Sequence, residues 1–168
     1  DSTLMAACDA DVGPVELCVS PAIEDACWHE ISLPSRVNTS SQGVGDLGQR
    51  LARAAQRALA SAQPLILIGT DCVEMCPQLL QQAAQRLQKH DAVIYPSADG
   101  GYALLGLRRF DHTLFDGIPW STAQVCQQTT TRIQDLGWQL AQGDTLHDID
   151  EPADLALLPP HWRIADHG

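Results

Sequence analysis

LILIGTDC, residues 65–72, is the stretch that decides the fold. Its first four residues, Leu65 to Ile68, form an unbroken aliphatic run, which is typical of a central strand in a sheet covered on both faces. Gly69 and Thr70 end this strand, so Asp71 emerges at its carboxyl end. Open α/β sheets bind ligands and metal ions at that end of their strands. Asp71 is therefore either a site residue or an ordinary turn aspartate.

The segments around this strand predict a βαβ unit. Before it, residues 46–62 place small and aliphatic side chains at helical spacing, with Asp46 as the expected N-cap. After it, residues 77–90 begin with a proline and repeat the helical pattern, and DAVIYP at 91–96 is strand-like. Strand, helix and strand within about 30 residues are typical of parallel strands joined by a right-handed crossover. We therefore expect a fully buried central strand in a mainly parallel sheet, flanked by these two helices.

Weaker patterns define the rest of the chain. We expect a helix ending near Asp9, strands at 15–20, 102–107 and 138–142, a loop at 35–45, and helices at 121–136 and 152–158. The helix at 121–136 is expected to start with a capping box, because Ser121 and Gln124 have the S-x-x-Q spacing. The length of 168 residues, 45% of them apolar, fits one α/β domain.

The charge of the chain limits its partners. With 21 acidic against 10 basic residues, the net charge is −11 and the pI is about 4.6. Extended contact with nucleic acid or with an anionic membrane surface favours clustered lysine and arginine, so neither partner is expected. A phosphate ligand would instead be bound through a bridging cation. No membrane-spanning apolar run and no secretory leader is visible, so a cytoplasmic location is expected.

Acidic residues recur next to strand ends. Asp71 follows the strand at 65–68, Asp99 lies in the SADGGY turn, and Asp148 and Asp150 lie in HDIDEP. A hard divalent cation takes oxygen ligands, and it can neutralise a nucleotide diphosphate while the leaving group departs. Carboxylates from separate strand ends can converge on one ion of this kind. The acids of HDIDEP are also what the first turn of any helix favours.

Two glycine-rich segments are candidate ligand loops. In SADGGY, Gly100 and Gly101 allow backbone amides to approach a ligand closely, although DG and GG are also ordinary hairpin turns. QGVGDLG at 42–48 lacks the lysine of a P-loop and follows no clear strand, so a Walker or Rossmann site is disfavoured. No G-x-S-x-G motif is present, which argues against a serine hydrolase. The six cysteines form no C-x-x-C pair, and we expect reduced thiols.

Five motifs in order, QGVGDLGQRL, LILIGTDC, VIYPSADGGYALLGL, LFDGIPWST and DIDEPADL, resemble a bacterial glycosyltransferase-A-like family. The resemblance spans residues 2–158. This family is related to the guanylyltransferases that make 2-phospho-L-lactate-derived and molybdopterin dinucleotide cofactors. The resemblance implies a three-layer α/β/α sandwich of the nucleotide-diphospho-sugar transferase type, which binds an activated nucleotide together with Mg²⁺ or Mn²⁺.

The resemblance also implies roles for individual residues. It places Asp71, Asp148 and Asp150 at the metal site, and it makes Asp71 and Asp99 the candidate catalytic residues. The candidate substrate-binding residues that it marks are Gln42, Gly45, Asp46, Gly69, Thr70, Gly100, Gly101, Tyr102, Trp120 and Ser121.

The chain departs from the family pattern at its start. The family usually opens with a strand and a basic G-x-x-K-T-R loop that contacts the nucleotide phosphates, and we expect the single domain at 1–168 to lack both. Val73 also replaces a common proline. The preferred function is metal-dependent glycosyl transfer from a nucleotide sugar. Nucleotidyl transfer from a nucleoside triphosphate and a non-catalytic nucleotide-binding domain are the alternatives, because the fold alone does not choose among them.

Overall fold

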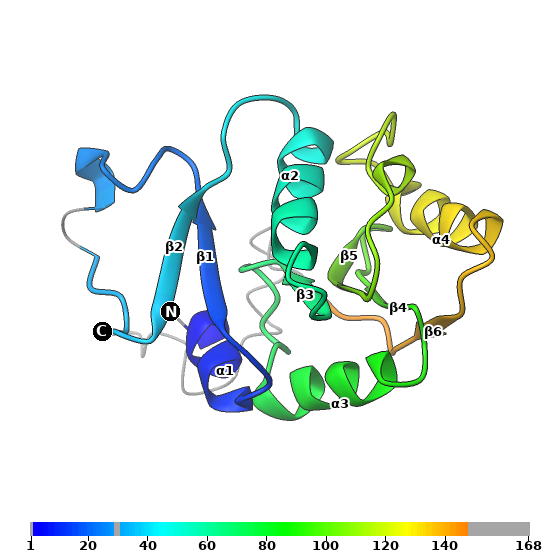
Figure 1. The fold of residues 1–168 in the computed structure, drawn as a ribbon, viewed down its shortest axis with the longest axis horizontal. Helices are drawn as coiled ribbons and strands as arrows, with labels where there is room; N and C mark the ends of the chain where they lie inside the picture. Colours follow the sequence, from blue (N-terminus) through cyan, green and yellow to red (C-terminus); the bar gives the residue numbers. More distant parts are fainter. Residues whose placement is uncertain (1, 29–30, 148–168) are drawn as a thin grey trace, which may run out of the picture.

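The computed structural model describes residues 2–28 and 31–147. Figure 1 labels the helices and strands on the ribbon. In chain order they are α1 (Ser2–Ala10), β1 (Val15–Val19), η1 (Ala26–Trp28), β2 (Val37–Ser41), α2 (Leu47–Leu59), β3 (Leu65–Ile68), α3 (Pro77–Leu87), β4 (Ala92–Pro96), β5 (Tyr102–Leu107), η2 (His112–Leu114), α4 (Val125–Asp135) and β6 (Leu140–Gln142).

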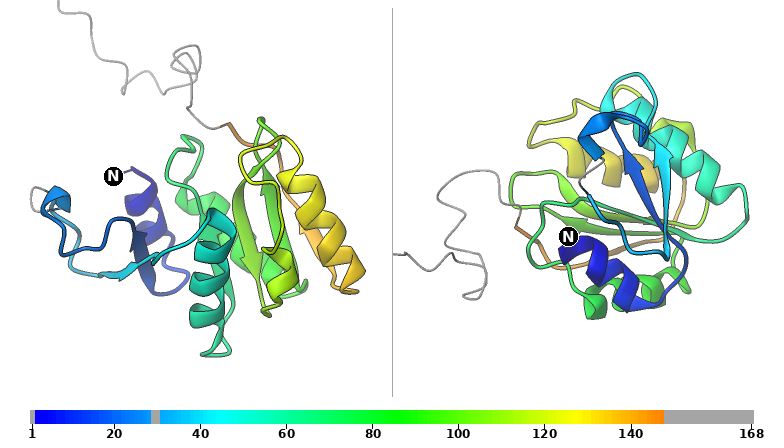
Figure 2. Two further views of the ribbon diagram at one scale, coloured as in Figure 1. Left: turned by 90° about the horizontal axis from the view of Figure 1, so that it is seen from above. Right: turned by 90° about the vertical axis from the view of Figure 1, so that its left-hand side faces the viewer.

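The main sheet has the strand order β3–β5–β4–β6 in the described residues. Strand β5 runs antiparallel to both β3 and β4, whereas β4 and β6 are parallel. Three of these strands therefore share one direction, and β5 makes the sheet mixed. Helices α1 and α3 lie on one side of the sheet and α2 and α4 on the other (Figure 2). The α/β/α sandwich expected from the sequence is confirmed.

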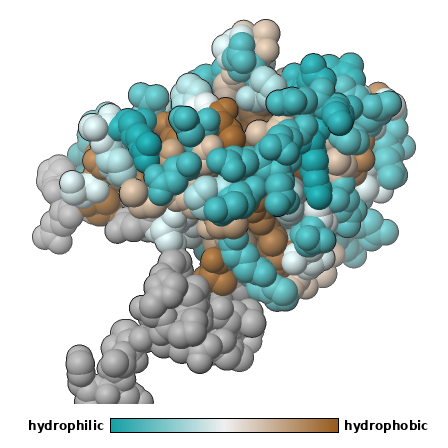
Figure 3. All heavy atoms as spheres, turned by 90° about the horizontal axis from the view of Figure 1, so that it is seen from below, coloured by the Kyte–Doolittle hydropathy of each residue, from teal (hydrophilic) through white to brown (hydrophobic). Residues whose placement is uncertain are grey.

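Each face of the main sheet has its own hydrophobic core. On the α3 side, Leu80 and Leu87 of α3 pack with Val93 of β4. On the opposite side, Ile133 of α4 packs with Ile94 of β4. Successive strand residues point to opposite faces, so the aliphatic run of β4 is explained by burial on both sides. Outside these cores, the surface seen from the α3 side is mainly hydrophilic (Figure 3).

The position of β3 differs from the prediction. The strand forms as expected, and Ile66 packs on the α3-side core while Leu67 packs on the opposite core. In the described residues, however, β3 lies at the edge of the sheet, pairs with antiparallel β5, and keeps all four side chains half-exposed. The prediction of a fully buried central strand is therefore wrong. An aliphatic run indicates that both faces of a strand are covered, but it does not indicate whether the strand pairs with a neighbour on one edge or on both.

A second sheet pairs β1 with β2 in parallel, with Val15 opposite Val37. The prediction of a loop at 35–45 is wrong for Val37–Ser41, which forms β2. The sequence VNTSS has few apolar residues because most of this strand is exposed. Backbone pairing with β1, rather than side-chain burial, keeps it extended, and a burial pattern does not reveal such a strand.

The other predicted elements agree with the structure except for the start of α4. Helix α2 begins with a capping box between Asp46 and Gln49, which confirms the predicted N-cap. Helix α4 begins at Val125, because Ser121 has a left-handed backbone (φ 61°) and no side chain caps the helix. The predicted helix at 152–158 lies outside the described residues.

No disulfide joins any pair of the six cysteines, all of which are described. Within residues 2–28 and 31–147, no helix is long and apolar enough to cross a bilayer.

Candidate functional site

The loop that carries Asp71 and the SADGGY turn both lie at one end of the main sheet. Asp71 follows the end of β3, where the Gly69 amide still donates to the carbonyl of Ala103 in β5 (3.0 Å). At the same end, Pro96 of β4 pairs with Tyr102 of β5, and the glycine-rich turn connects these two strands. The Asp71 loop and this turn therefore both project from the carboxyl ends of β3 and β4, the usual ligand side of an α/β sheet.

The chain beyond β6 returns to this end of the sheet. The Leu146 amide donates to the carbonyl of Pro96 (2.8 Å), and the Ala98 amide donates to the carbonyl of Leu146 (2.9 Å). His147 then reaches the Asp71 loop, where its backbone N–H donates to Oε2 of Glu74 (2.7 Å). Three segments that are far apart in the sequence thus meet at one end of the sheet.

Asp71 is well suited to bind a hard cation. Its side chain is exposed, and its carboxylate has no hydrogen-bond or ion-pair partner in the described part of the chain. Carboxylate oxygens of this kind are the ligands that Mg²⁺ and Mn²⁺ prefer. The two other predicted ligands, Asp148 and Asp150, lie outside the described residues. Among residues 2–28 and 31–147, no three His, Cys, Asp or Glu side chains are grouped so that they could hold a metal.

The SADGGY turn is closed by its own aspartate. Oδ1 of Asp99 accepts hydrogen bonds from the Gly101 amide (2.9 Å) and from the Ser97 hydroxyl. Gly100 has φ +91°, and a β-carbon there would collide with the backbone of Ala123. The turn therefore requires glycine at this position for both its conformation and its packing. Asp99 forms the turn, and its catalytic role stays a prediction.

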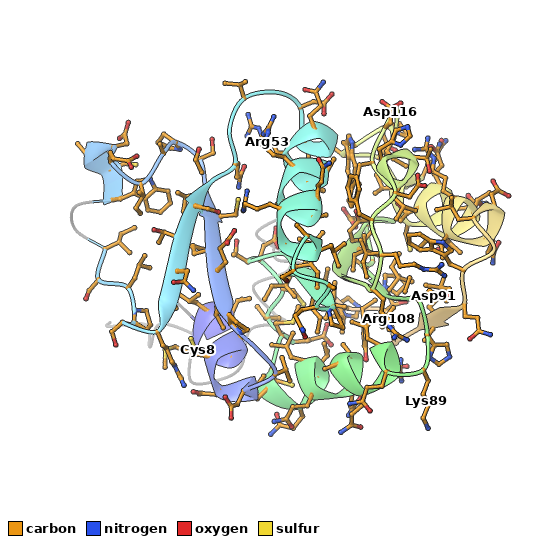
Figure 4. The ribbon with its side chains drawn as sticks, in the orientation of Figure 1. Cys8, Arg53, Lys89, Asp91, Arg108 and Asp116 are labelled. Atoms are coloured by element: carbon orange, nitrogen blue, oxygen red, sulfur yellow. The ribbon has the colours of Figure 1, made fainter. Side chains whose placement is uncertain are left out.

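Two arginines of α2 hold the loop that leads from β2 into this helix. Arg53 donates to the carbonyls of Gln42 and Val44, and Arg50 donates to the carbonyl of Gly45 (2.8 Å). Figure 4 shows Arg53 reaching from α2 toward this loop. The guanidinium groups thus satisfy backbone carbonyls of the loop before α2 and hold the shape of the glycine-rich segment.

Two side chains predicted to bind substrate in this loop are engaged within the protein. The amide nitrogen of Gln42 donates to the carbonyl of Cys18 in β1 (3.0 Å). Asp46 accepts from the Gln49 amide (2.8 Å) and caps α2. These bonds give both residues a structural role, so their contact with a substrate stays a prediction.

Trp120 connects the start of α2 to the main sheet. Its ring packs edge-to-face on Tyr102, with centroids 6.5 Å apart. A β-carbon on Gly48 of α2 would collide with the indole nitrogen, so the helix and the indole are in close contact. Burial raises the pKa of Tyr102 far above its ordinary value. Among the described residues its hydroxyl, beside that of Thr129, has no partner in hydrogen-bonding geometry. A substrate could therefore contact the ring or backbone of Tyr102 but not its hydroxyl.

The remaining predicted substrate-binding residues lie on exposed loops. Gly69 and Thr70 connect β3 to Asp71, and the carbonyl of Thr70 accepts a hydrogen bond from the Thr3 hydroxyl (3.3 Å). Ser121 is exposed and follows Trp120. The structure thus brings the Asp71 loop together with the SADGGY turn, and the loop at 42–46 together with Trp120 through the start of α2.

The sequence interpretation missed Glu74, His147, Arg50 and Arg53. Glu74 lies in the same loop as Asp71, and His147 directly precedes the predicted acidic ligands. The available signal was that a carboxylate, Glu74, lies close in sequence to Asp71, and that a histidine, His147, directly precedes Asp148. Arg50 and Arg53 are spaced about one helical turn apart after a glycine-rich loop, and this spacing was the signal that they could contact the loop.

Comparison with protein families identifies the chain. The family described as an uncharacterized protein conserved in bacteria (DUF2064) matches residues 3–122, well over half of the sequence. The chain belongs to this family. The match to DUF2064 runs from α1 to Thr122, so it includes the Asp71 loop, the SADGGY turn and Trp120.

A solved structure shares the fold of this DUF2064 chain. It is the crystal structure of a proposed nucleotide-diphospho-sugar transferase from Desulfovibrio desulfuricans G20, with a TM-score of 0.77 and 27% sequence identity. The match covers 98% of this chain and 76% of that chain. No curated protein matches the sequence. This member of DUF2064 thus has the fold of a proposed nucleotide-diphospho-sugar transferase.

Proposed function

We propose that this protein is a metal-dependent transferase that uses an activated nucleotide, with a nucleotide sugar as the preferred donor. The observation that carries the proposal is the meeting of three segments at the carboxyl end of the main sheet. They are the loop with Asp71, the turn at 97–101, and the chain at His147 that leads to Asp148. The name of the Desulfovibrio protein favours a nucleotide sugar over other activated nucleotides.

The Asp71 carboxylate is of the ligand type that a hard cation takes. Asp71, whose exposed carboxylate has no partner among residues 2–28 and 31–147, would hold the ion together with Asp148 and Asp150. When bound, the cation would neutralise the charge of a nucleoside diphosphate leaving group. The amides of the glycine-rich turn at 99–101 would approach the donor or the acceptor.

Nucleotidyl transfer from a nucleoside triphosphate is the alternative, because it needs the same carboxylates to hold the cation. A relation to the guanylyltransferases stays a prediction. The identity of the nucleotide that binds most tightly distinguishes glycosyl transfer from nucleotidyl transfer. A nucleotide sugar that binds more tightly than the matching triphosphate supports glycosyl transfer, and the reverse order supports nucleotidyl transfer. A nucleotide that binds without any turnover supports a non-catalytic domain.

The test is a thermal-shift screen of the protein with nucleoside diphosphates, nucleotide sugars and nucleoside triphosphates, each with and without Mn²⁺. We expect at least one nucleotide to stabilise the protein only when Mn²⁺ is present. A ligand at about 100 times its dissociation constant adds about 2.7 kcal/mol to the free energy of unfolding. Asp71→Asn is expected to abolish this Mn²⁺-dependent gain while leaving the unliganded stability nearly unchanged.

A matched control is Asp135→Asn, which also removes one negative charge. Asp135 is exposed in the last turn of α4, and the chain just after it pairs Gln139 with Ala92 at the opposite end of the sheet. This variant is expected to respond to Mn²⁺ and nucleotide like the parent. The proposal fails if no nucleotide shows Mn²⁺-dependent stabilisation, or if Asp71→Asn responds as strongly as the parent.

A further inference from the structure

Two arginines of α2 set the orientation of peptide groups in the loop before this helix. Arg53 donates to the carbonyls of Gln42 and Val44, the second at 2.8 Å. Arg50, earlier in the helix, donates to the carbonyl of Gly45 at 2.8 Å. Figure 4 shows Arg53 on the side of α2 that faces this loop. Three carbonyls of the loop are therefore turned toward the helix.

The bond from Arg53 also turns one amide of the loop outward. The N–H and C=O of a planar trans peptide point in opposite directions, so the bond to the Val44 carbonyl directs the Gly45 N–H away from the guanidinium. Gly45 is exposed, and its N–H has no hydrogen-bond partner in the described part of the chain. Its φ of +113° is a conformation that other residues rarely adopt. The loop therefore offers a free backbone donor at a position that requires glycine.

The peptide groups around this donor are held in place. The Gly43 N–H donates to the Ser41 hydroxyl (3.1 Å), and the Asp46 N–H donates to Oε1 of Gln49 (3.2 Å). The side chain of Val44, next to the free amide, is 85% exposed. A polar donor and an apolar side chain thus lie side by side on a loop of fixed shape. Sites for small ligands combine these two kinds of group.

The loop is connected to the candidate site through the start of α2. Gly48, in the first turn of α2, is in close contact with the Trp120 indole. Trp120 packs on Tyr102, which directly follows the SADGGY turn. Two aromatic rings thus link the loop to the turn at the carboxyl end of the main sheet.

We infer that Arg53 is a positioning residue of the nucleotide site. It holds the peptide between Val44 and Gly45 so that the Gly45 N–H donates to an oxygen of the bound nucleotide. The inference rests on the nucleotide binding of the proposed function. Loss of one hydrogen bond of this kind weakens binding about tenfold.

Two substitutions separate positioning from a direct role of the charge. Arg53→Ala releases both carbonyls, whereas Arg53→Lys keeps the charge but replaces the planar fork with a single ammonium. If Arg53 attracted the nucleotide through its charge, Lys would bind like the parent. If Arg53 positions the loop, both variants should be impaired. The control is Arg36→Ala, which also removes one positive charge, because Arg36 pairs with Asp9 near the opposite end of β2 from the loop.

The measurement is nucleotide affinity in the presence of Mn²⁺. UDP, GDP, ADP and CDP, their glucose conjugates and the matching triphosphates are screened by thermal shift with the parent. The Kd of the most stabilising nucleotide is then measured for each variant by titration calorimetry. We expect Arg53→Ala to bind about tenfold more weakly, Arg53→Lys at least about threefold more weakly, and Arg36→Ala like the parent. Parental affinity in Arg53→Ala or in Arg53→Lys would overturn the inference.

NMR of the loop amides reports the positioning itself. When the nucleotide is added, the Gly45 amide resonance of the parent should shift and its exchange with water should slow. In Arg53→Ala neither change is expected. Without nucleotide, the Asp46 amide should exchange faster in Arg53→Ala than in the parent or in Arg36→Ala. A Gly45 amide that does not respond to the nucleotide in the parent would also overturn the inference.

Asp71→Asn separates this inference from the proposed function. If Asp71→Asn loses nucleotide binding and Arg53→Ala keeps it, the inference about Arg53 fails and the proposed function stands. If Asp71→Asn keeps binding and Arg53→Ala loses it, the proposed metal dependence fails and the inference about Arg53 stands. If no nucleotide stabilises the parent, both fail.

Discussion

The hydroxyl of Thr129 is fully buried in the middle of α4 beside that of Tyr102, and neither hydroxyl has a partner in hydrogen-bonding geometry among the described residues. A buried hydroxyl without a partner costs free energy, because it gives up its bonds to water and gains none in return. Valine has nearly the same shape and no hydroxyl. We therefore expect Thr129→Val to raise the free energy of unfolding by about 1 kcal/mol, measured by urea denaturation.

Thr131 in the same helix provides the control for this prediction. It is exposed, and its hydroxyl donates to the carbonyl of Gln127 (3.0 Å). Thr131→Val is expected to change stability by less than about 0.5 kcal/mol. A destabilisation of more than about 1 kcal/mol by Thr129→Val would mean that this hydroxyl is bonded after all, for instance to a buried water.

At the residue scale, the sequence predicted that Asp71 and Asp99 follow strand ends but not which of the two is already hydrogen-bonded. Asp71 and Asp99 both follow strands of the main sheet, as their sequence positions indicated. Asp99 is bonded to Ser97 and Gly101, whereas the carboxylate of Asp71 has no partner in the described residues. These bonds depend on the local conformation of the turn, which a residue pattern does not determine. Glu74 was missed for a related reason, since its partner His147 lies 73 positions away.

Helix α2 depends on a glycine at its second position. Gly48 is buried, and a β-carbon there would collide with the Trp120 indole and lie 2.5 Å from the carbonyl oxygen of Phe115. Helix propensity alone would favour alanine by about 1 kcal/mol. Overpacking costs about 1–3 kcal/mol, and a backbone carbonyl cannot easily move away.

We therefore expect Gly48→Ala to lower the free energy of unfolding by about 1–2 kcal/mol, in denaturant titrations of both proteins. The fluorescence of Trp120 should shift as well, because the indole is the nearest side chain to the new methyl group. A stabilised variant would show that helix propensity dominates and that α2 is not in close contact with Trp120.

At the element scale, the sequence predicted the buried segments well and the exposed ones poorly. The aliphatic run of β4 and the capping box of α2 both formed as expected, because burial and capping leave a periodic or fixed-spacing pattern. The exposed strand β2 leaves no such pattern, and the loop prediction there was wrong. The start of α4 was predicted too early, because the S-x-x-Q spacing does not reveal the left-handed backbone of Ser121.

At the scale of the whole molecule, α2 joins the two sheets. It lies between the β1–β2 sheet and the main sheet (Figure 1). Arg57 of α2 donates to Glu16 of β1 and to the hydroxyl of Ser40 in β2 (2.9 Å). The Ser40 hydroxyl in turn donates to Glu16 (2.6 Å). This cluster of three side chains ties the small sheet to the helix layer of the sandwich.

The cluster should make the stability of the molecule depend on pH. Partial burial raises the pKa of the Glu16 carboxyl, but hydrogen bonds from Ser40 and Arg57 outweigh burial and hold this pKa below its ordinary value of 4.5. A carboxyl with a lowered pKa in the folded state stabilises the protein above its unfolded-state pKa. That contribution is lost as the pH falls through the folded-state value.

Glu16→Gln tests this dependence by urea denaturation between pH 7 and pH 3. The parent should be more stable than the variant by about 0.5–1 kcal/mol at pH 7, a small margin because Glu16 and Arg57 are 43% and 41% exposed and solvent screens the pair. The difference should shrink toward zero as the pH falls below about 4.5, since the protonated carboxyl of the parent then resembles the neutral amide of the variant. Glu24→Gln, at an exposed position after β1, should match the parent throughout. A difference that stays constant down to pH 3 would show that Gln perturbs packing instead, and that the charge of Glu16 does not hold the two sheets together.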